Sequence, residues 1–129
     1  MNSLLIKSID LKNKLTLHLY DESIKMIGDR WLVTLVARIK IAVDNVCHQQ
    51  DRSSLPPEGE IKKIIGKEIV FEQKRNRIFV DKNDKKAVLQ ELCDTFIENT
   101  LPYLSHADFP KRFLAKKFKE EKDKQLYKR

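Results

Sequence analysis

Every second residue from Trp31 to Val43 is apolar, a period of two that an extended strand satisfies and a helix does not. The even-numbered positions of this stretch begin with Leu32 and change to Arg38 and Lys40. Because successive side chains of a strand point to opposite faces, the pattern predicts one fully covered face and one partly covered face. Antiparallel sheets commonly have such a pair of faces. The odd-numbered positions are all apolar: Trp31, Val33, Leu35, Ala37, Ile39, Ile41 and Val43.

Shorter segments of the same kind lie on both sides of this strand. Leu15, Leu17 and Leu19 alternate with polar or aromatic residues, and Leu4 to Ile9 is a weaker segment. The two segments after residue 67 are predicted to form a hairpin, because the polar residues Arg75 and Asn76 suit its tip. The predicted strands are 4–9, 14–20, 31–43, 68–73 and 77–81.

The apolar period becomes helical after residue 83. Apolar residues recur every three or four positions and predict a helix over 84–104, which Pro102 ends or kinks. A shorter helix is predicted over 58–65, ended by Gly66. All strands precede the main helix, so the fold class is α+β: a mainly antiparallel sheet of four to five strands packed by C-terminal helices. A last helix starts near residue 108 and is expected to dock through Phe109, Phe113 and Phe118.

A chain of 129 residues suits one domain. We expect a single compact α+β domain over 1–118 and a charged, fraying helix end over 119–129. The first residues lack the pattern of a signal peptide, and the longest apolar run is far shorter than a membrane span of about 20 residues. Cys47 and Cys93 lie far apart and outside any C-x-x-C pattern, which is typical of reduced thiols. The sequence therefore predicts a cytoplasmic protein that does not enter a membrane.

The positive charge is concentrated at the C-terminal end. The chain has 26 Lys+Arg and 19 Asp+Glu, a formal net charge of +7. Residues 111–129 contain nine of the basic and three of the acidic side chains, so the other 110 residues are close to neutral. A basic helix of this kind attracts phosphate groups, on nucleic acid or on an anionic surface. The alternative is a solvated helix end whose cations complement the helix dipole.

A second basic cluster lies at the predicted hairpin tip, where long side chains would be free to reach a phosphate backbone. No RNA-binding sequence motif accompanies it. The two clusters together supply the candidate residues for binding nucleic acid or another anion: Lys74, Arg75, Arg77, Lys111, Arg112, Lys116, Lys117 and Lys119.

The sequence offers no pattern for other chemistry. Its three glycines are not arranged as a phosphate-binding loop, and its histidines and cysteines lack the short paired spacings of zinc sites. Cys47 and His48 are neighbours in the chain, and neighbouring side chains diverge on a strand or helix. We therefore expect no catalytic residue, no metal site and no cofactor.

Three functional hypotheses remain. The first is a small non-catalytic interaction module whose partner is another macromolecule, a protein or nucleic acid, which an exposed sheet edge or apolar patch would favour. The second is a nucleic-acid or ribonucleoprotein accessory protein that uses the basic C-terminal helix, which a continuous basic face would favour. The third is a small enzyme built from scattered carboxylates and histidines, which a pocket with two perturbed titratable groups would favour. The sequence leaves the oligomeric state open.

Overall fold

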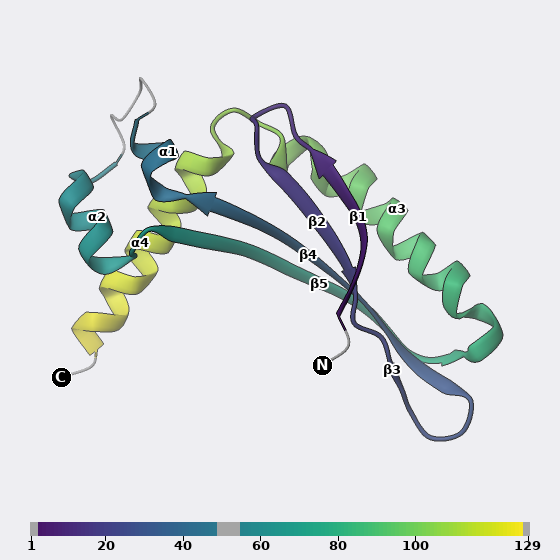
Figure 1. Ribbon diagram of the computed structural model, residues 1–129. Helices are drawn as coiled ribbons and strands as arrows, with labels where there is room; N and C mark the ends of the chain where they lie inside the picture. Colours follow the sequence, from purple (N-terminus) through teal and green to yellow (C-terminus); the bar gives the residue numbers. More distant parts are fainter. Residues whose placement is uncertain (1–2, 49–54, 128–129) are drawn as a thin grey trace. The chain divides into compact units, whose positions relative to one another are not determined.

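The computed structural model describes residues 3–48 and 55–127 and contains an antiparallel sheet with helices (Figure 1). This arrangement confirms the predicted α+β fold with C-terminal helices. A short 3-10 turn, η1 (Lys82–Asp84), leads from the last strand into the main helix. The strands are β1 (Leu4–Asp10), β2 (Thr16–Asp21), β3 (Ile24–Lys25), β4 (Arg30–Ala42) and β5 (Glu68–Asp81). The helices are α1 (Val43–Cys47), α2 (Glu58–Ile64), α3 (Lys85–Leu104) and α4 (Phe109–Tyr127).

The long strand β4 organises the sheet. β2 pairs with it antiparallel, with Tyr20 opposite Val36, and β3 continues in the same register, with Ile24 opposite Leu32. β1 pairs with β2, and β5 pairs with β4. The predicted two faces of β4 are confirmed, since its odd-numbered residues from Val33 to Ile41 are buried and Lys40 is exposed.

The predicted hairpin around Arg75 and Asn76 is wrong, because β5 is one continuous strand that passes through both residues. β4 is 13 residues long and offers backbone hydrogen-bonding groups along its whole length. A continuous partner strand satisfies more of those groups than a hairpin that turns away would. The basic residues 74–77 therefore lie in the middle of a strand and not at an exposed tip.

β5 contains a β-bulge. It has 14 residues against the 13 of β4, although hydrogen bonds join the residues next to both ends of the two strands. The Lys82 N–H donates to the Asp29 carbonyl at 3.0 Å, and the Val43 N–H donates to the Lys67 carbonyl at 2.9 Å. The extra residue must be accommodated between these points, and Phe79 there has a left-handed φ of +58°.

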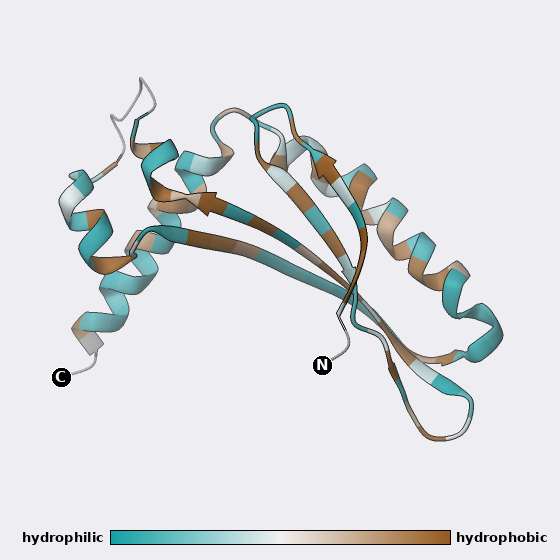
Figure 2. Cartoon of the chain, in the orientation of Figure 1, coloured by the Kyte–Doolittle hydropathy of each residue, from teal (hydrophilic) through white to brown (hydrophobic). Residues whose placement is uncertain are grey.

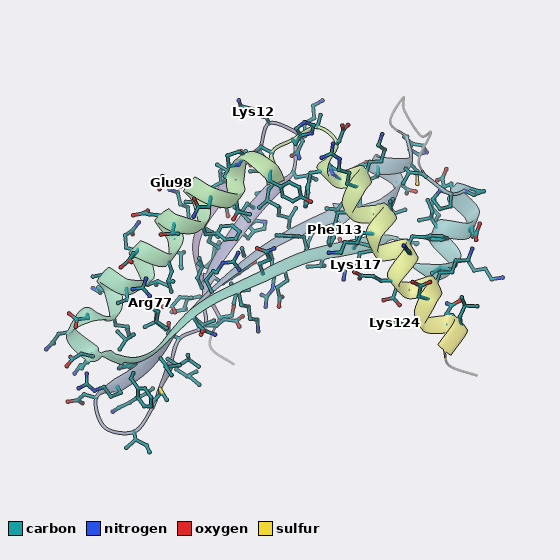
Figure 3. All side chains as sticks on the ribbon, turned by 180° about the vertical axis from the view of Figure 1, so that it is seen from behind. Lys12, Arg77, Glu98, Phe113, Lys117 and Lys124 are labelled. Atoms are coloured by element: carbon teal, nitrogen blue, oxygen red, sulfur yellow. The ribbon has the colours of Figure 1, made fainter. Side chains whose placement is uncertain are left out.

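The chain packs as two compact units. Unit 1 comprises Met1–Ile39 and Glu72–Ser105. Within it, α3 lies along one face of the strands (Figures 1 and 3). Cys93, Phe96 and Leu104 form the buried stripe of this helix, as the helical period predicts. Pro102 lies inside α3, and the helix ends two residues later at Leu104.

Unit 2 comprises Lys40–Phe71 and His106–Arg129, and α4 is its longest helix. Three phenylalanine rings pack together between α4 and the start of β5. The Phe71 ring lies edge-on to the rings of Phe109 and Phe113, with centroids 5.5 Å apart in both pairs. Leu114 and Ile61 are fully buried in the same unit. The predicted docking of α4 is confirmed for Phe109 and Phe118, which are buried, and Phe113 is half-buried.

The short helices of unit 2 differ in how well their pattern predicts them. α2 ends at Ile64, one residue before the predicted end, and Gly66 follows with a left-handed φ of +99°. α1 was not predicted, although Val43, Val46 and Cys47 are buried at helical spacing. The predicted domain boundary at residue 118 stays a prediction, and α4 runs across that position.

Candidate interaction surfaces

The basic residues of β5 are occupied by partners within unit 1. Arg77 donates to both carboxylate oxygens of Glu91 on α3, at 2.8 and 3.3 Å (Figure 3). This hydrogen-bonded pair raises the pKa of Arg77 and lowers the pKa of Glu91. The Arg75 guanidinium lies 5.6 Å from the centroid of the Phe96 ring. These two cations therefore help to hold β5 and α3 together.

Lys74 belongs to a polar cluster centred on Arg38. The Arg38 Nε donates to Glu72 at 2.6 Å, and its guanidinium also donates to Glu22 at 3.1 Å. The Lys74 Nζ lies 3.9 Å from Glu22 and 4.0 Å from Glu72. Arg38 also stacks over the Tyr20 ring at 5.1 Å. Two cations and two carboxylates balance here, so the cluster has no net charge to attract a phosphate.

Ion pairs lower the pKa of three carboxylates, Asp44, Glu72 and Glu91, and so favour their charged forms. The hydrogen bond from Arg38 lowers the pKa of Glu72, and Lys62 similarly lowers the pKa of Asp44. A general acid would need a carboxyl pKa that is raised. Burial raises the pKa of the Cys93 thiol, which makes it a poorer nucleophile. Among residues 3–48 and 55–127, no three metal-binding side chains cluster closely enough to hold an ion.

The exposed face of α4 has a different character. Arg112, Lys116 and Lys119 are exposed and follow one another at spacings of four and three residues. At about 100° per residue, these three side chains share one face of the helix, opposite the buried Leu114 and Phe118. We call this set the α4 basic stripe. It contains three of the five candidate residues that the sequence places on this helix.

The other candidate cations of α4 lie toward the flanks. Lys111 and Lys117 are half-buried, and the Lys117 Nζ lies 3.8 Å from Glu120 and 5.7 Å from the Phe113 ring. Both Lys117 and Phe113 are labelled in Figure 3. The basic residues 74–77 of β5 belong to unit 1 and those of α4 belong to unit 2, and a continuous basic face that joins them stays a hypothesis.

Unit 1 also exposes apolar side chains that were not predicted from the sequence as candidate binding residues. Ile24 lies on β3, Ile27 lies in the turn of the hairpin that β3 and β4 form, and Ile78 and Phe79 lie at the bulge of β5. Their exposed fractions run from 55% to 93%. Figure 2 shows hydrophobic residues reaching the tip of this hairpin. We call these four residues the hairpin-end apolar surface.

The β-ladder brings these residues together. Ile24 is paired with Leu32 on β4. Counting from either terminal hydrogen bond of the β4–β5 pair places Leu32 opposite Ile78 or Phe79. Adjacent strands lie about 4.8 Å apart, so Ile24 and the bulge residues flank Leu32 within about 10 Å of each other.

Two unfavourable features lie at the same end of unit 1. The left-handed backbone of Phe79 is rare for a bulky residue and costs about 1–2 kcal/mol. The indole N–H of Trp31 is buried and has no hydrogen-bond partner among the described residues. The Lys85 ammonium lies 3.7 Å from the Trp31 ring centroid. Strained backbone and unsatisfied polar groups tend to accumulate at functional sites.

A second group of exposed aliphatic residues lies on β1, at one end of the strand order. Leu4, Leu5 and Ile6 are exposed there. The pairing of β1 with β2 shifts between Leu5 and Lys7, and such irregularities blunt an edge strand against further pairing. The hairpin-end apolar surface is therefore the stronger candidate for a partner.

The comparisons with known proteins add no name to this description: no protein family model, curated protein or solved structure matches the chain. Within the described residues, no helix combines the length and apolarity that crossing a membrane requires.

The sequence did contain a signal for the hairpin-end surface. Ile78, Phe79 and Val80 are three consecutive apolar residues, which breaks the alternation of a half-covered strand. Ile27 stands beside Gly28 in a connection where polar residues are usual. Such departures from pattern can mark a bulge or a binding surface, but they do not show that strands far apart in sequence bring them together.

Proposed function

We propose that the protein is an interaction module whose protein partner docks on the hairpin-end apolar surface of unit 1. One observation carries this proposal: four large apolar side chains of unit 1 are exposed, three on strands β3 and β5 and one, Ile27, in the turn between β3 and β4. One of the four is an aromatic ring on a strained bulge. Burying these side chains in a partner would contribute several kcal/mol to the free energy of binding, at roughly 25 cal/mol per Å² of apolar surface. The partner is a protein that presents an apolar pocket or groove.

The exposed aromatic ring supports a binding role over a structural one. Phe79 is 63% exposed and gains little from burial within its own chain. Its backbone conformation suits glycine better than phenylalanine, so stability alone favours replacing it. Aromatic anchors are enriched at the centres of protein interfaces. We place this module in the cytoplasm, because two buried thiols suit a reducing compartment.

Site-specific photocrosslinking in the cells that produce the protein tests the proposal. A photoreactive amino acid at position 24 or 27 is expected to capture the same protein from both positions. The matched control is position 126, because Leu126 is an exposed apolar residue of unit 2 (61% exposed). Capture from 24 and 27 but not from 126 supports docking on unit 1.

The variant Phe79→Gly tests whether capture of this protein depends on the hairpin-end apolar surface. Phe79→Gly removes the ring and relieves the left-handed strain, so its stability is expected to stay within about 1 kcal/mol of the wild type. The crosslinked product is expected to fall strongly in this variant, while circular dichroism shows the same fold. Equal capture from all three positions, or capture that Phe79→Gly leaves intact, would rule the proposal out. A crosslinked dimer of the chain itself would assign the surface to self-association instead.

A further inference from the structure

We infer that the α4 basic stripe of unit 2 binds the phosphate backbone of a nucleic-acid duplex without reading its sequence. This site is separate in residues and in chemistry from the hairpin-end apolar surface, and it stands or falls independently of the proposed function. Arg112, Lys116 and Lys119 form the stripe and are all exposed. Seven residues of helix span about 10 Å, so the three cations form a straight row along α4.

The stripe is available for a ligand. Lys116 and Lys119 have no ion-pair partner within the described part of the chain. Arg112 has one weak partner, Asp108, which directly precedes α4 and lies 3.7 Å away. The flanking lysines are engaged instead, with the Lys122 Nζ 3.3 Å from Glu60. The helix thus pairs some of its cations internally and leaves a row of others unneutralised.

The composition of unit 2 reinforces this local field. Its two segments, 40–71 and 106–129, contain 14 of the 26 Lys+Arg and only nine of the 19 Asp+Glu. Unit 1 is more nearly balanced, with 12 basic and 10 acidic residues. An excess of cations next to an unpaired row raises the local concentration of polyanions and the rate of their association.

A membrane surface fits the stripe less well than nucleic acid. A helix that lies in a membrane interface needs an unoccupied apolar face. The apolar face of α4 is already buried within unit 2 through Phe109, Leu114 and Phe118. Among the described side chains of α4, Leu126 is the one large apolar residue that is exposed. The helix therefore offers charge without a means of insertion.

A duplex fits better than a single strand. Proteins that bind single strands combine a basic groove with aromatic rings on which bases stack. The phenylalanine rings of unit 2 are buried or half-buried: Phe71, Phe109, Phe113 and Phe118. A row of cations without a stacking platform contacts backbone phosphates and carries no sequence information.

Fluorescence anisotropy with a labelled DNA duplex of mixed sequence tests this inference. Three phosphate contacts predict a slope of about −2.7 for the logarithm of the binding constant against the logarithm of salt concentration. The variant Arg112→Gln/Lys116→Gln/Lys119→Gln is expected to weaken binding at low salt by roughly tenfold or more. Glutamine is a good helix former, so α4 is expected to remain helical by circular dichroism.

The control removes the same charge elsewhere. Lys12, Lys82 and Lys86 are exposed lysines of unit 1, and Lys12 is labelled in Figure 3. The triple variant Lys12→Gln/Lys82→Gln/Lys86→Gln is expected to retain the salt slope and most of the affinity. Equal losses in the two triple variants would show that net charge alone drives binding and would overturn the inference.

Two further probes decide between classes of ligand. Vesicles rich in phosphatidylserine and a polyglutamate chain are titrated at the same low salt. Duplex binding that exceeds both is the expected result. Binding to vesicles or polyglutamate at least as tight as to the duplex, or no duplex binding at about 50 mM salt, would overturn the assignment to nucleic acid.

Discussion

Unit 1 and unit 2 leave different kinds of side chain at their surfaces. Eight of the ten large hydrophobic residues that are exposed in the described chain belong to unit 1, and the other two are Val70 and Leu126. Unit 2 instead exposes the α4 basic stripe. Each unit has its own buried core, so these surfaces are not explained by incomplete folding. This contrast is the reason why we propose protein docking on unit 1 and phosphate binding on unit 2.

The basic clusters of the two units show why a count of charges does not locate a binding site. On β5, Arg77 faces Glu91 and Lys74 faces two carboxylates, so the local charge is neutralised. On α4, Lys116 and Lys119 face solvent. The same residue type therefore stabilises the fold in one place and remains available to a ligand in another. What lies opposite a cation decides its role.

The largest expected effect is on stability, and it distinguishes the buried Phe109 of unit 2 from the exposed Phe79 of unit 1. Phe109→Ala in unit 2 is expected to lower the free energy of unfolding by about 3–5 kcal/mol, because the ring is fully buried against Phe71 and Phe113. Phe79→Ala in unit 1 is expected to cost less than about 1 kcal/mol, because most of that ring is exposed. Urea denaturation followed by circular dichroism measures both. Similar losses would show that Phe79 is a core residue and would remove the contrast between the surfaces.

The sequence was sufficient to predict the parts of this fold that depend on local periodicity. The apolar odd-numbered positions identified β4, and the helical stripe identified α3 and the docking residues of α4. The hairpin at Arg75 was wrong because a polar run resembles a turn, and only the long partner strand shows that pairing continues through it. The bulge at Phe79 depends on the register of two distant segments, which periodicity does not contain.

The candidate site was predicted less completely, because contacts between residues far apart in sequence do not appear in its periodicity or charge composition. Charge composition located the α4 basic stripe, and helical spacing separates Arg112, Lys116 and Lys119 from their neighbours. The ion-pair partners of the charged β5 residues are tertiary contacts: Glu91 is 14 residues from Arg77, and Arg38 is 34 residues from Glu72. Pairings of this kind follow from the packing of the fold.

The next prediction compares Lys116 of the α4 basic stripe with Arg77 of β5. Lys116→Gln is expected to reduce the magnitude of the salt slope for duplex binding by about one, because one phosphate contact is lost. Arg77→Gln is expected to leave that slope unchanged and to lower the thermal midpoint, because Glu91 loses its bidentate partner. Anisotropy and thermal unfolding of both variants provide the test. A slope that falls with Arg77→Gln would return the β5 cluster to the list of candidate ligand contacts.

The smallest effect concerns the neutralised cluster around Arg38. Its hydrogen bond lowers the pKa of Glu72 below the ordinary carboxyl value of 4.5. As the pH falls, the unfolded chain therefore binds this proton before the folded protein does, and protonation favours unfolding. The stabilisation from Glu72 is present above about pH 4.5 and is lost as the pH falls through the lower folded pKa.

Glu72→Gln isolates this contribution. The variant is expected to be less stable than the wild type at pH 7 and to lose less stability between pH 7 and pH 3. Glu98→Gln is the matched control, because Glu98 is an exposed carboxylate of α3 without an ion pair among the described residues (Figure 3). Urea denaturation at several pH values measures both. If the two variants had the same pH dependence, the Arg38 cluster would contribute no specific ion-pair stability, and its carboxylates would have to be reconsidered as ligand-binding groups on the surface of unit 1.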